Sequence, residues 1–190
     1  MRALAVIISA AAASAGAADF QAFGLVIGSD VGLRECPRMS MPAVKGFTPP
    51  YAPITSPCLK PNAGGDTGFV AFPPGQQPQH AVGGQLGYRL EGGRLAAIWL
   101  TTAGAPVQQR VFDDLVRKYG APQHEKREAV VTAAGANFEA VRAIWAQADL
   151  RVEFMGVTNR ADTGELVIGT PAGVAALRGS QAALISSRPM

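Results

Sequence analysis

Few residues in this chain could carry acid–base or nucleophilic chemistry. The sequence contains two histidines, His80 and His124, each within a polar stretch. Nucleophilic catalysis needs a Ser, Cys or Thr beside a base that a third group orients, and neither stretch supplies that pattern. The separation of the two histidines also matches no metal-ligand spacing. Both are therefore predicted to be solvated surface residues.

Three acidic residues, Glu139, Glu153 and Glu165, fall on predicted strands and could be neighbours in a sheet. Two facing carboxylates can serve as the acid and base of a glycoside hydrolase. A secreted hydrolase with an acidic or His-containing site is therefore an alternative for this chain. A concave pocket lined by two or more of His80, His124, Glu139 and Glu153 would favour it.

The first residues resemble an export signal. A positive start at Arg2 precedes an Ala-rich apolar run over 3–13 and a small-x-small site at 15–17. This pattern is typical of a secretory signal peptide, predicted here over residues 1–17. The run is shorter than the roughly 20 residues of a membrane-spanning helix, so no transmembrane segment is predicted in the mature chain. The predicted location is the periplasm or the extracellular medium.

The predicted compartment indicates the state of the cysteines. The chain has two, Cys36 and Cys58, and an even pair in an exported protein is most simply a disulfide. A metal site would need more ligands than two thiolates. The sequence therefore predicts a Cys36–Cys58 bond and assigns no catalytic, cofactor-binding or metal-ligating residue, and no cofactor.

Length and composition indicate one folded unit. The chain has 190 residues, 48% of them hydrophobic and 16% charged, with a formal net charge of +3. This predicts a single α+β domain over 18–178, followed by a flexible tail over 179–190. The basic residues gather on no predicted helix face, so nucleic acid is not expected as a partner.

The clearest structural signal is an amphipathic helix over 105–120. Val107, Val111 and Leu115 recur every four residues, and Gly120 suits the position just beyond the helix end. Strand-like segments lie on both sides of this helix. We therefore expect it to be the main helix, packed against a sheet.

The acidic pair Asp113–Asp114 on that helix has a structural explanation. Each acid precedes a base by four residues, Arg117 and Lys118 respectively. Ion pairs at this spacing stabilise a helix by about 0.2–0.5 kcal/mol each. The pair is therefore interpreted as surface pairing rather than as a catalytic dyad.

The predicted fold is α+β: one main helix on an antiparallel sheet of about five strands. Gly92–Gly93 separates two apolar segments and predicts a tight hairpin. The strands are expected over 85–91, 94–101, 136–146, 150–158 and 165–170, with weaker candidates over 127–132 and 67–72 and a short N-terminal strand within 19–28. Residues 171–190 are predicted to be a frayed tail with at most one helical turn.

The hairpin formed by 136–146 and 150–158 has a register that burial can select. Pairing Trp145 with Val152 places Phe154 on the same apolar face and Arg142 on the opposite, polar face. A shift by one residue would scatter both sets, so the first register is predicted.

A proline-rich stretch interrupts the regular pattern. Ten of the 14 prolines lie between Pro37 and Pro78, which excludes regular helix from most of this region. Residues 37–66 are therefore predicted to form an irregular surface excursion that the Cys36–Cys58 bond fastens.

The run L-V-R-K-Y-G-A-P at 115–122, the pair Ile144–Trp145 and the run G-E-L-V-I at 164–168 carry a resemblance. They resemble small exported bacterial proteins of uncharacterised function, in which a helix ending Tyr-Gly-x-Pro precedes an antiparallel sheet. The general shape is also similar to the helix-on-sheet modules of outer-membrane assembly lipoproteins and of β-lactamase inhibitor proteins. The likeness covers roughly 107–170, lacks the lipid-accepting Cys of the lipoproteins and supplies no catalytic residue. It implies a fold and a binding role in the envelope.

Three functions remain at this point. The leading hypothesis is a non-enzymatic, exported bacterial protein that binds another protein or an envelope component, because no catalytic pattern stands out. A closed core with an exposed apolar patch would favour it. The alternatives are the secreted hydrolase and a small-ligand carrier with an apolar cavity between helix and sheet. The oligomeric state does not follow from the sequence.

Overall fold

A computed structural model of the chain describes residues 21–42, 45–131, 135 and 137–186. The signal peptide predicted over 1–17 lies outside these residues. Within the described part of the chain, no helix is long and apolar enough to cross a membrane.

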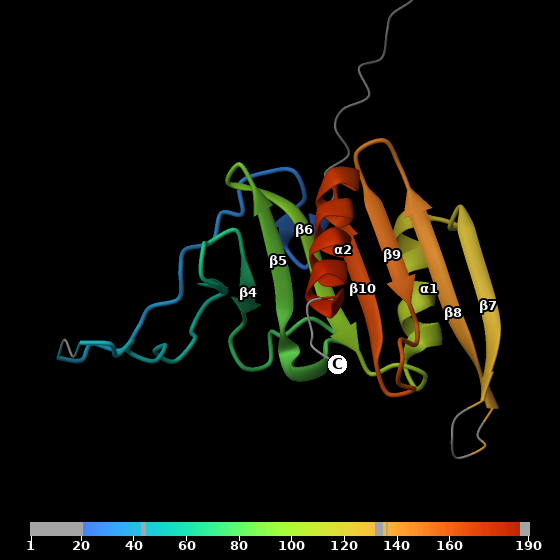
Figure 1. Cartoon of the computed structure of the whole chain (residues 1–190), viewed down its shortest axis with the longest axis horizontal. Helices are drawn as coiled ribbons and strands as arrows, with labels where there is room; N and C mark the ends of the chain where they lie inside the picture. Colours follow the sequence, from blue (N-terminus) through green and yellow to red (C-terminus); the bar gives the residue numbers. More distant parts are fainter. Residues whose placement is uncertain (1–20, 43–44, 132–134, 136, 187–190) are drawn as a thin grey trace, which may run out of the picture.

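The centre of the molecule is an antiparallel sheet of eight strands in the order β3-β4-β5-β6-β10-β9-β8-β7 (Figure 1). The strands are β3 (Cys58–Pro61), β4 (Thr67–Ala71), β5 (Leu86–Glu91), β6 (Arg94–Thr102), β7 (His124–Val131), β8 (Asn137–Ala146), β9 (Arg151–Met155) and β10 (Gly164–Gly169). The expectation of about five strands and one main helix is corrected: the described chain has eight strands in this sheet and two α-helices. The weaker strand candidates over 127–132 and 67–72 both join the sheet, the first as its edge strand β7 and the second as β4, between β3 and β5.

The sheet is made of two consecutive meanders. Strands β3 to β6 pair in chain order, as do β7 to β10, and helix α1 (Gln108–Tyr119) carries the chain from one meander to the other. Strand β10 then returns to pair with β6, from Gly164 opposite Thr102 to Gly169 opposite Ala97. This pairing places β6 in the middle of the sheet, with hydrogen-bonded neighbours on both edges.

The two predicted hairpins are confirmed. Gly92 and Gly93 both have positive φ and connect β5 to β6, as a tight two-residue turn requires. In the second hairpin Trp145 pairs with Val152 and Ala143 with Phe154, which is the register that burial selects. Trp145 is buried in the core.

Helix α1 covers one face of the sheet and packs mainly over β8. Val111, Phe112 and Leu115 are buried against it, as the apolar period predicts. The Phe112 and Trp145 rings lie 6.0 Å apart, and the Trp145 indole N–H donates a hydrogen bond to the Gly120 carbonyl at 2.7 Å. This bond satisfies a buried indole and fixes the end of the helix to the sheet.

The N-terminal segment covers the rest of that face. It is a two-stranded hairpin of β1 (Gln21–Ala22) and β2 (Leu25–Val26), and Ala22, Leu25 and Ile27 are buried in the same core cluster. The single strand predicted within 19–28 is therefore wrong, because the chain folds back at Phe23–Gly24.

A second helix, α2 (Pro171–Ser186), covers the opposite face over β5, β6 and β10. Val174 and Leu177 are buried with Val167 of β10, and Trp99 packs beside them. The frayed tail predicted from 171, with a flexible part from 179, is thus corrected as far as Ser186. Residues 187–190 lie outside the described chain.

The proline-rich excursion projects from the β3 edge as an arm, defined here as residues 37–42 and 45–57 (Figure 1). The predicted Cys36–Cys58 disulfide is present at its base, with the two Cα atoms 4.9 Å apart. Backbone hydrogen bonds join Met39 to Pro50 and Ala52 to Pro37, so the arm folds back on itself near the base. After the arm the chain enters the sheet as β3, a strand that the sequence analysis assigned to the irregular region.

Candidate functional site

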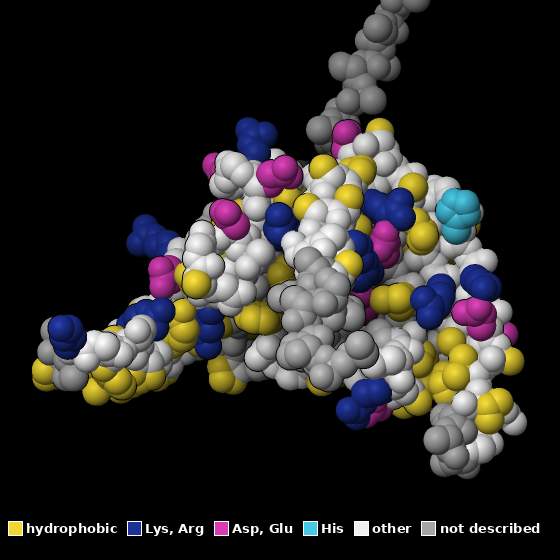
Figure 2. All heavy atoms as spheres, in the orientation of Figure 1, with side chains coloured by type: hydrophobic (Ala, Val, Ile, Leu, Met, Phe, Trp, Pro, Cys, Tyr) yellow, Lys and Arg dark blue, Asp and Glu magenta, His cyan; other side chains and the backbone are white. Residues whose placement is uncertain are grey.

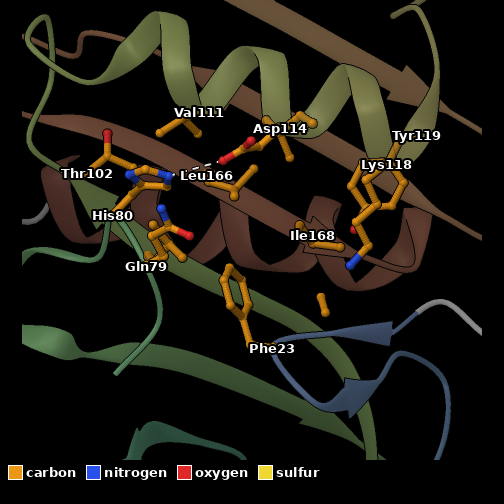
Figure 3. A pocket seen from close by; sticks show the side chains of 13 residues that line it. Phe23, Gln79, His80, Thr102, Val111, Asp114, Lys118, Tyr119, Leu166 and Ile168 are labelled. Atoms are coloured by element: carbon orange, nitrogen blue, oxygen red, sulfur yellow. Dashed lines mark hydrogen bonds and ion pairs between the residues drawn. The ribbon is translucent and has the colours of Figure 1, made fainter. Parts of the chain in front are cut away.

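A cavity of about 190 Å³ lies between α1, the N-terminal hairpin and the sheet (Figure 3). Its floor is apolar and comes from β6 and β10, which supply Leu100, Leu166 and Ile168. The remaining lining residues are Ala22, Phe23, Gln79, His80, Thr102, Val111, Asp114, Leu115, Lys118 and Tyr119. The space exists because the helix and the hairpin each cover part of one sheet face and leave a gap between them.

Two lining residues have strained backbones. Phe23 has φ 57° and His80 has φ 70°, and they are the two non-glycine residues with positive φ in the described ranges. This conformation costs a residue with a Cβ roughly 1–2 kcal/mol. They lie 57 positions apart in the sequence, yet both side chains line this cavity. Strained residues that converge on one place are characteristic of functional sites.

The strain at Phe23 has a specific origin. Phe23 and Gly24 form the two-residue turn between β1 and β2, and both have positive φ. Such turns are normally made by Asn-Gly or Gly-Gly, which adopt positive φ at little cost. We therefore explain the presence of a phenylalanine in this turn by its side chain, which reaches from the turn into the cavity (Figure 3).

A histidine–carboxylate pair stands at one end of the cavity. His80 Nε2 lies 3.2 Å from Asp114 Oδ2, and Arg117 donates a 2.8 Å hydrogen bond to Asp114 Oδ1. The His80 side chain is 12% exposed and that of Asp114 is 40% exposed, so the pair lies at the rim. Burial raises the pKa of Asp114, but the hydrogen bonds from His80 and Arg117 outweigh it and hold the pKa below its ordinary value.

The other end is formed by the last turn of α1. Tyr119 is largely buried there, and burial raises its pKa to about 12. Burial also lowers the pKa of Lys118, whose ammonium group is 5.3 Å from the centre of the Tyr119 ring. In Figure 3 these two side chains lie beside Ile168, away from His80. The cavity therefore has an apolar middle and two different polar ends.

The cavity also contains a polar group that no described protein group satisfies. The Thr102 hydroxyl near His80 is buried and has no hydrogen-bond partner in the described part of the chain. Asp114 is already engaged by His80 and Arg117.

The structure brings two of the other candidate residues together and leaves Glu139 apart. His124 and Glu153 line a second hollow formed by β7, β8 and β9, whereas Glu139 lines neither space. Two of the four residues named for a hydrolase thus line one hollow, which is the arrangement stated above to favour the hydrolase alternative. Arg151 and Arg178 contact Glu153 at 2.6 and 2.9 Å. Burial raises the pKa of Glu153, but these partners outweigh it and lower the pKa, so Glu153 is a paired carboxylate rather than a poised acid.

Two residues of the cavity behave differently from their sequence interpretation. His80 was expected to be solvated and instead has a mostly covered side chain in contact with Asp114. Asp114 pairs with Arg117, three positions on, rather than showing the four-residue pairing expected for both acids of the helix, and Asp113 accepts a hydrogen bond from Gln109. No local pattern reports a His80–Asp114 contact, because 34 positions separate the two residues.

Comparisons with known proteins give no relative for this chain. No family model, no curated protein and no solved structure matches it. The resemblance to small exported bacterial proteins therefore stays a prediction, and the cavity itself is the basis for a functional proposal.

Proposed function

We propose that this chain is a non-enzymatic, exported bacterial protein that binds a small, largely apolar molecule in the cavity between α1, the N-terminal hairpin and the sheet. The observation that carries the proposal is the convergence of strained Phe23 and His80 on this one apolar space. Packed protein interiors contain few voids larger than a water molecule. Packing alone does not explain why this cavity is kept open and lined by two residues with strained backbones. We therefore infer that the cavity serves to bind a ligand.

The size of the cavity limits the ligand. An engineered cavity of about 150 Å³ lined by apolar side chains accepts benzene. The present cavity, of about 190 Å³, therefore fits a molecule with on the order of six to ten non-hydrogen atoms. The polar ends, with His80 and Asp114 on one side and Lys118 on the other, suit a ligand with an apolar body and a single polar group.

The proposed compartment is the periplasm or the extracellular medium. The disulfide supports it, because such bonds persist in oxidising compartments and are rare in the cytosol. The signal-like sequence over 1–17 supports it independently. Intact-mass analysis of the native protein tests this part, and retention of Arg2 in the mature protein would contradict it.

The binding proposal is tested by titrating the protein with benzene and with benzoate, a matched neutral and anionic pair. Methyl NMR signals of Val111, Leu115 and Ile168 are expected to shift, whereas those of Val174 on the opposite face are not. A preference for benzoate would assign the anionic end of the ligand to Lys118. Shifts spread evenly over the core, or none at saturating ligand, would contradict the proposal.

A pair of substitutions on α1 supplies the control. Val111→Phe fills the cavity and is expected to abolish the shifts. Val116→Phe makes the same change on the same helix at a half-buried position that does not line the cavity, so binding should remain. Equal binding by both variants would place the ligand elsewhere.

A further inference from the structure

The arm and its two flanks hold the net charge of the whole protein. Residues 34–60 contain four of the 17 basic residues and one of the 14 acidic residues. The remaining 13 basic and 13 acidic residues balance, so the entire formal charge of +3 belongs to this segment. Although the basic residues gather on no predicted helix face, their excess over the acidic residues lies in this one stretch of the chain.

The arm also exposes apolar side chains. Met39, Met41 and Phe47 are between 46% and 50% exposed, and they are half of the large hydrophobic residues exposed in the described part of the chain. In Figure 2 hydrophobic side chains run along one edge of the projecting arm, and basic ones lie on its other side. The arm thus presents an apolar edge beside cations.

The base of the arm is held in place. The Cys36–Cys58 bond closes it, and the Arg38 guanidinium donates to the Pro49 carbonyl at 3.0 Å and stacks 4.3 Å from the centre of the Tyr51 ring. Lys60 lies on that ring at 4.9 Å. The projection is therefore fixed to the β3 edge of the sheet rather than collapsed onto it.

The backbone of the arm suits a surface poor in hydrogen-bond partners. Six of its residues have no N–H group because they are prolines: Pro37, Pro42, Pro49, Pro50, Pro53 and Pro57. Each missing donor is one fewer polar group to desolvate when the arm enters an apolar environment. The same lack of donors makes the arm a poor partner for strand addition, which depends on backbone hydrogen bonds.

We propose that the arm docks on an anionic phospholipid surface, with Met39, Met41 and Phe47 inserted at the headgroup boundary and Arg34, Lys45 and Lys60 facing the anionic groups. Apolar side chains beside cations are the elements of interfacial membrane binding. The arm offers cations and exposed apolar side chains together, which is the combination that an anionic lipid surface accepts. The proposal is independent of the ligand cavity, because no described residue of 34–60 lines that cavity.

The test is sedimentation of the full protein with vesicles of phosphatidylcholine alone or with about one-third phosphatidylglycerol. Binding is expected only to the anionic vesicles, and it should weaken as salt is raised, because salt screens the cations. The triple variant Met39→Ser/Met41→Ser/Phe47→Ser should lose binding at least tenfold, and Lys45→Gln about fivefold, the effect of one surface cation. Val131→Ser removes an exposed apolar side chain at the other edge of the sheet and should bind like the wild type.

A spectroscopic readout separates insertion from simple electrostatic adsorption. Phe47→Trp should give a blue-shifted emission with anionic vesicles, measured as a difference from the wild type, whereas Val131→Trp should not. Absence of sedimentation with anionic vesicles at low salt would overturn the proposal and leave an acidic protein as the partner to seek. Unchanged sedimentation of the triple variant, or no spectral shift at position 47, would also overturn it. These outcomes leave the cavity titration unaffected.

Discussion

The two helices cover opposite faces of one sheet by different means. Helix α1 buries a stripe of large apolar side chains, Val111, Phe112 and Leu115. Helix α2 buries Val174 and Leu177 and also approaches the sheet closely at Gly173. A Cβ added at Gly173 would collide with the Ala96 carbonyl, so the two backbones are in close contact there.

Helix α2 is also held by charge. Arg178 contacts Glu165 at 2.5 Å and Glu153 at 2.9 Å, and Glu153 contacts Arg151 at 2.6 Å. The network joins the helix to β9 and β10 at partly buried positions. The packing of α1 on the sheet thus depends on the volume of buried apolar side chains. The packing of α2 depends on the close approach of two backbones and on ion pairs. Substitutions that change volume, shape or charge should therefore act differently on the two faces.

The largest expected effect is on the α1 face. Trp145→Ala removes a fully buried ring that contacts Phe112, and it leaves a cavity. We expect a loss of about 3–5 kcal/mol in the free energy of unfolding, measured by denaturant titration. If the variant melts like the wild type, Trp145 is exposed in solution, and the contrast between the two faces does not hold.

The second largest effect on stability is expected on the α2 face, from a substitution that adds a single carbon atom. Gly173→Ala is expected to cost about 1–3 kcal/mol, because the added Cβ meets the backbone of Ala96. Gly179→Ala, on the same helix, has open space and should stabilise by about 0.5–1 kcal/mol. Thermal melts compare the pair, and equal melting temperatures would show that α2 does not pack closely on the sheet.

The charge network predicts a pH dependence for the α2 face. The pKa of Glu153 is lowered from 4.5 in the folded state, so folding favours its ionised form. This contribution is complete above the unfolded pKa and is lost as pH falls through the lower folded pKa. Hydrogen exchange in α2 should therefore rise in that acidic range. In Glu153→Gln, which should cost about 1 kcal/mol at pH 7, exchange is expected to lose this added pH dependence.

The smallest effect is expected on the uncovered outer surface of the same sheet. Arg142 lies on the strand that carries Trp145, is 49% exposed and contacts Glu128 at 3.5 Å. Exposed pairs of this kind contribute little, so Arg142→Ala should change the free energy of unfolding by at most about 0.5 kcal/mol. A loss comparable to that of Trp145→Ala would mean that this surface is covered in solution.

The same contrast explains how much could be predicted from the sequence. Helix α1 and the Trp145 hairpin were predictable, because a repeated apolar period and alternating strands are local signals. Helix α2 was missed because it packs through Gly173 and is held by Arg178, and neither feature produces an apolar stripe. Strand β3 was predicted as irregular chain, and β7 was predicted only as a weak strand candidate. Both lie at an edge of the sheet, where fewer side chains need to be buried, so their sequences carry a weaker apolar pattern.

The cavity depends on relations that local patterns do not report. His80 meets Asp114 across 34 positions, and Phe23 reaches the cavity from a turn whose usual residues are Asn and Gly. The apolar cavity between helix and sheet was named as an alternative, but its lining was not. A phenylalanine directly before a glycine, between short apolar segments, is the one local signal that could have indicated the Phe23 turn.

The joining of the two meanders through β6 and β10 has a consequence for how the molecule folds. Within each meander neighbouring strands are close in the chain, whereas Thr102 and its partner Gly164 are 62 positions apart. Contacts that close long loops form slowly, because the chain loses more entropy before the contact is made. We therefore expect each meander to fold first and the central seam to close last. The middle of the finished sheet, rather than its edges, would then set the rate at which the native protein appears.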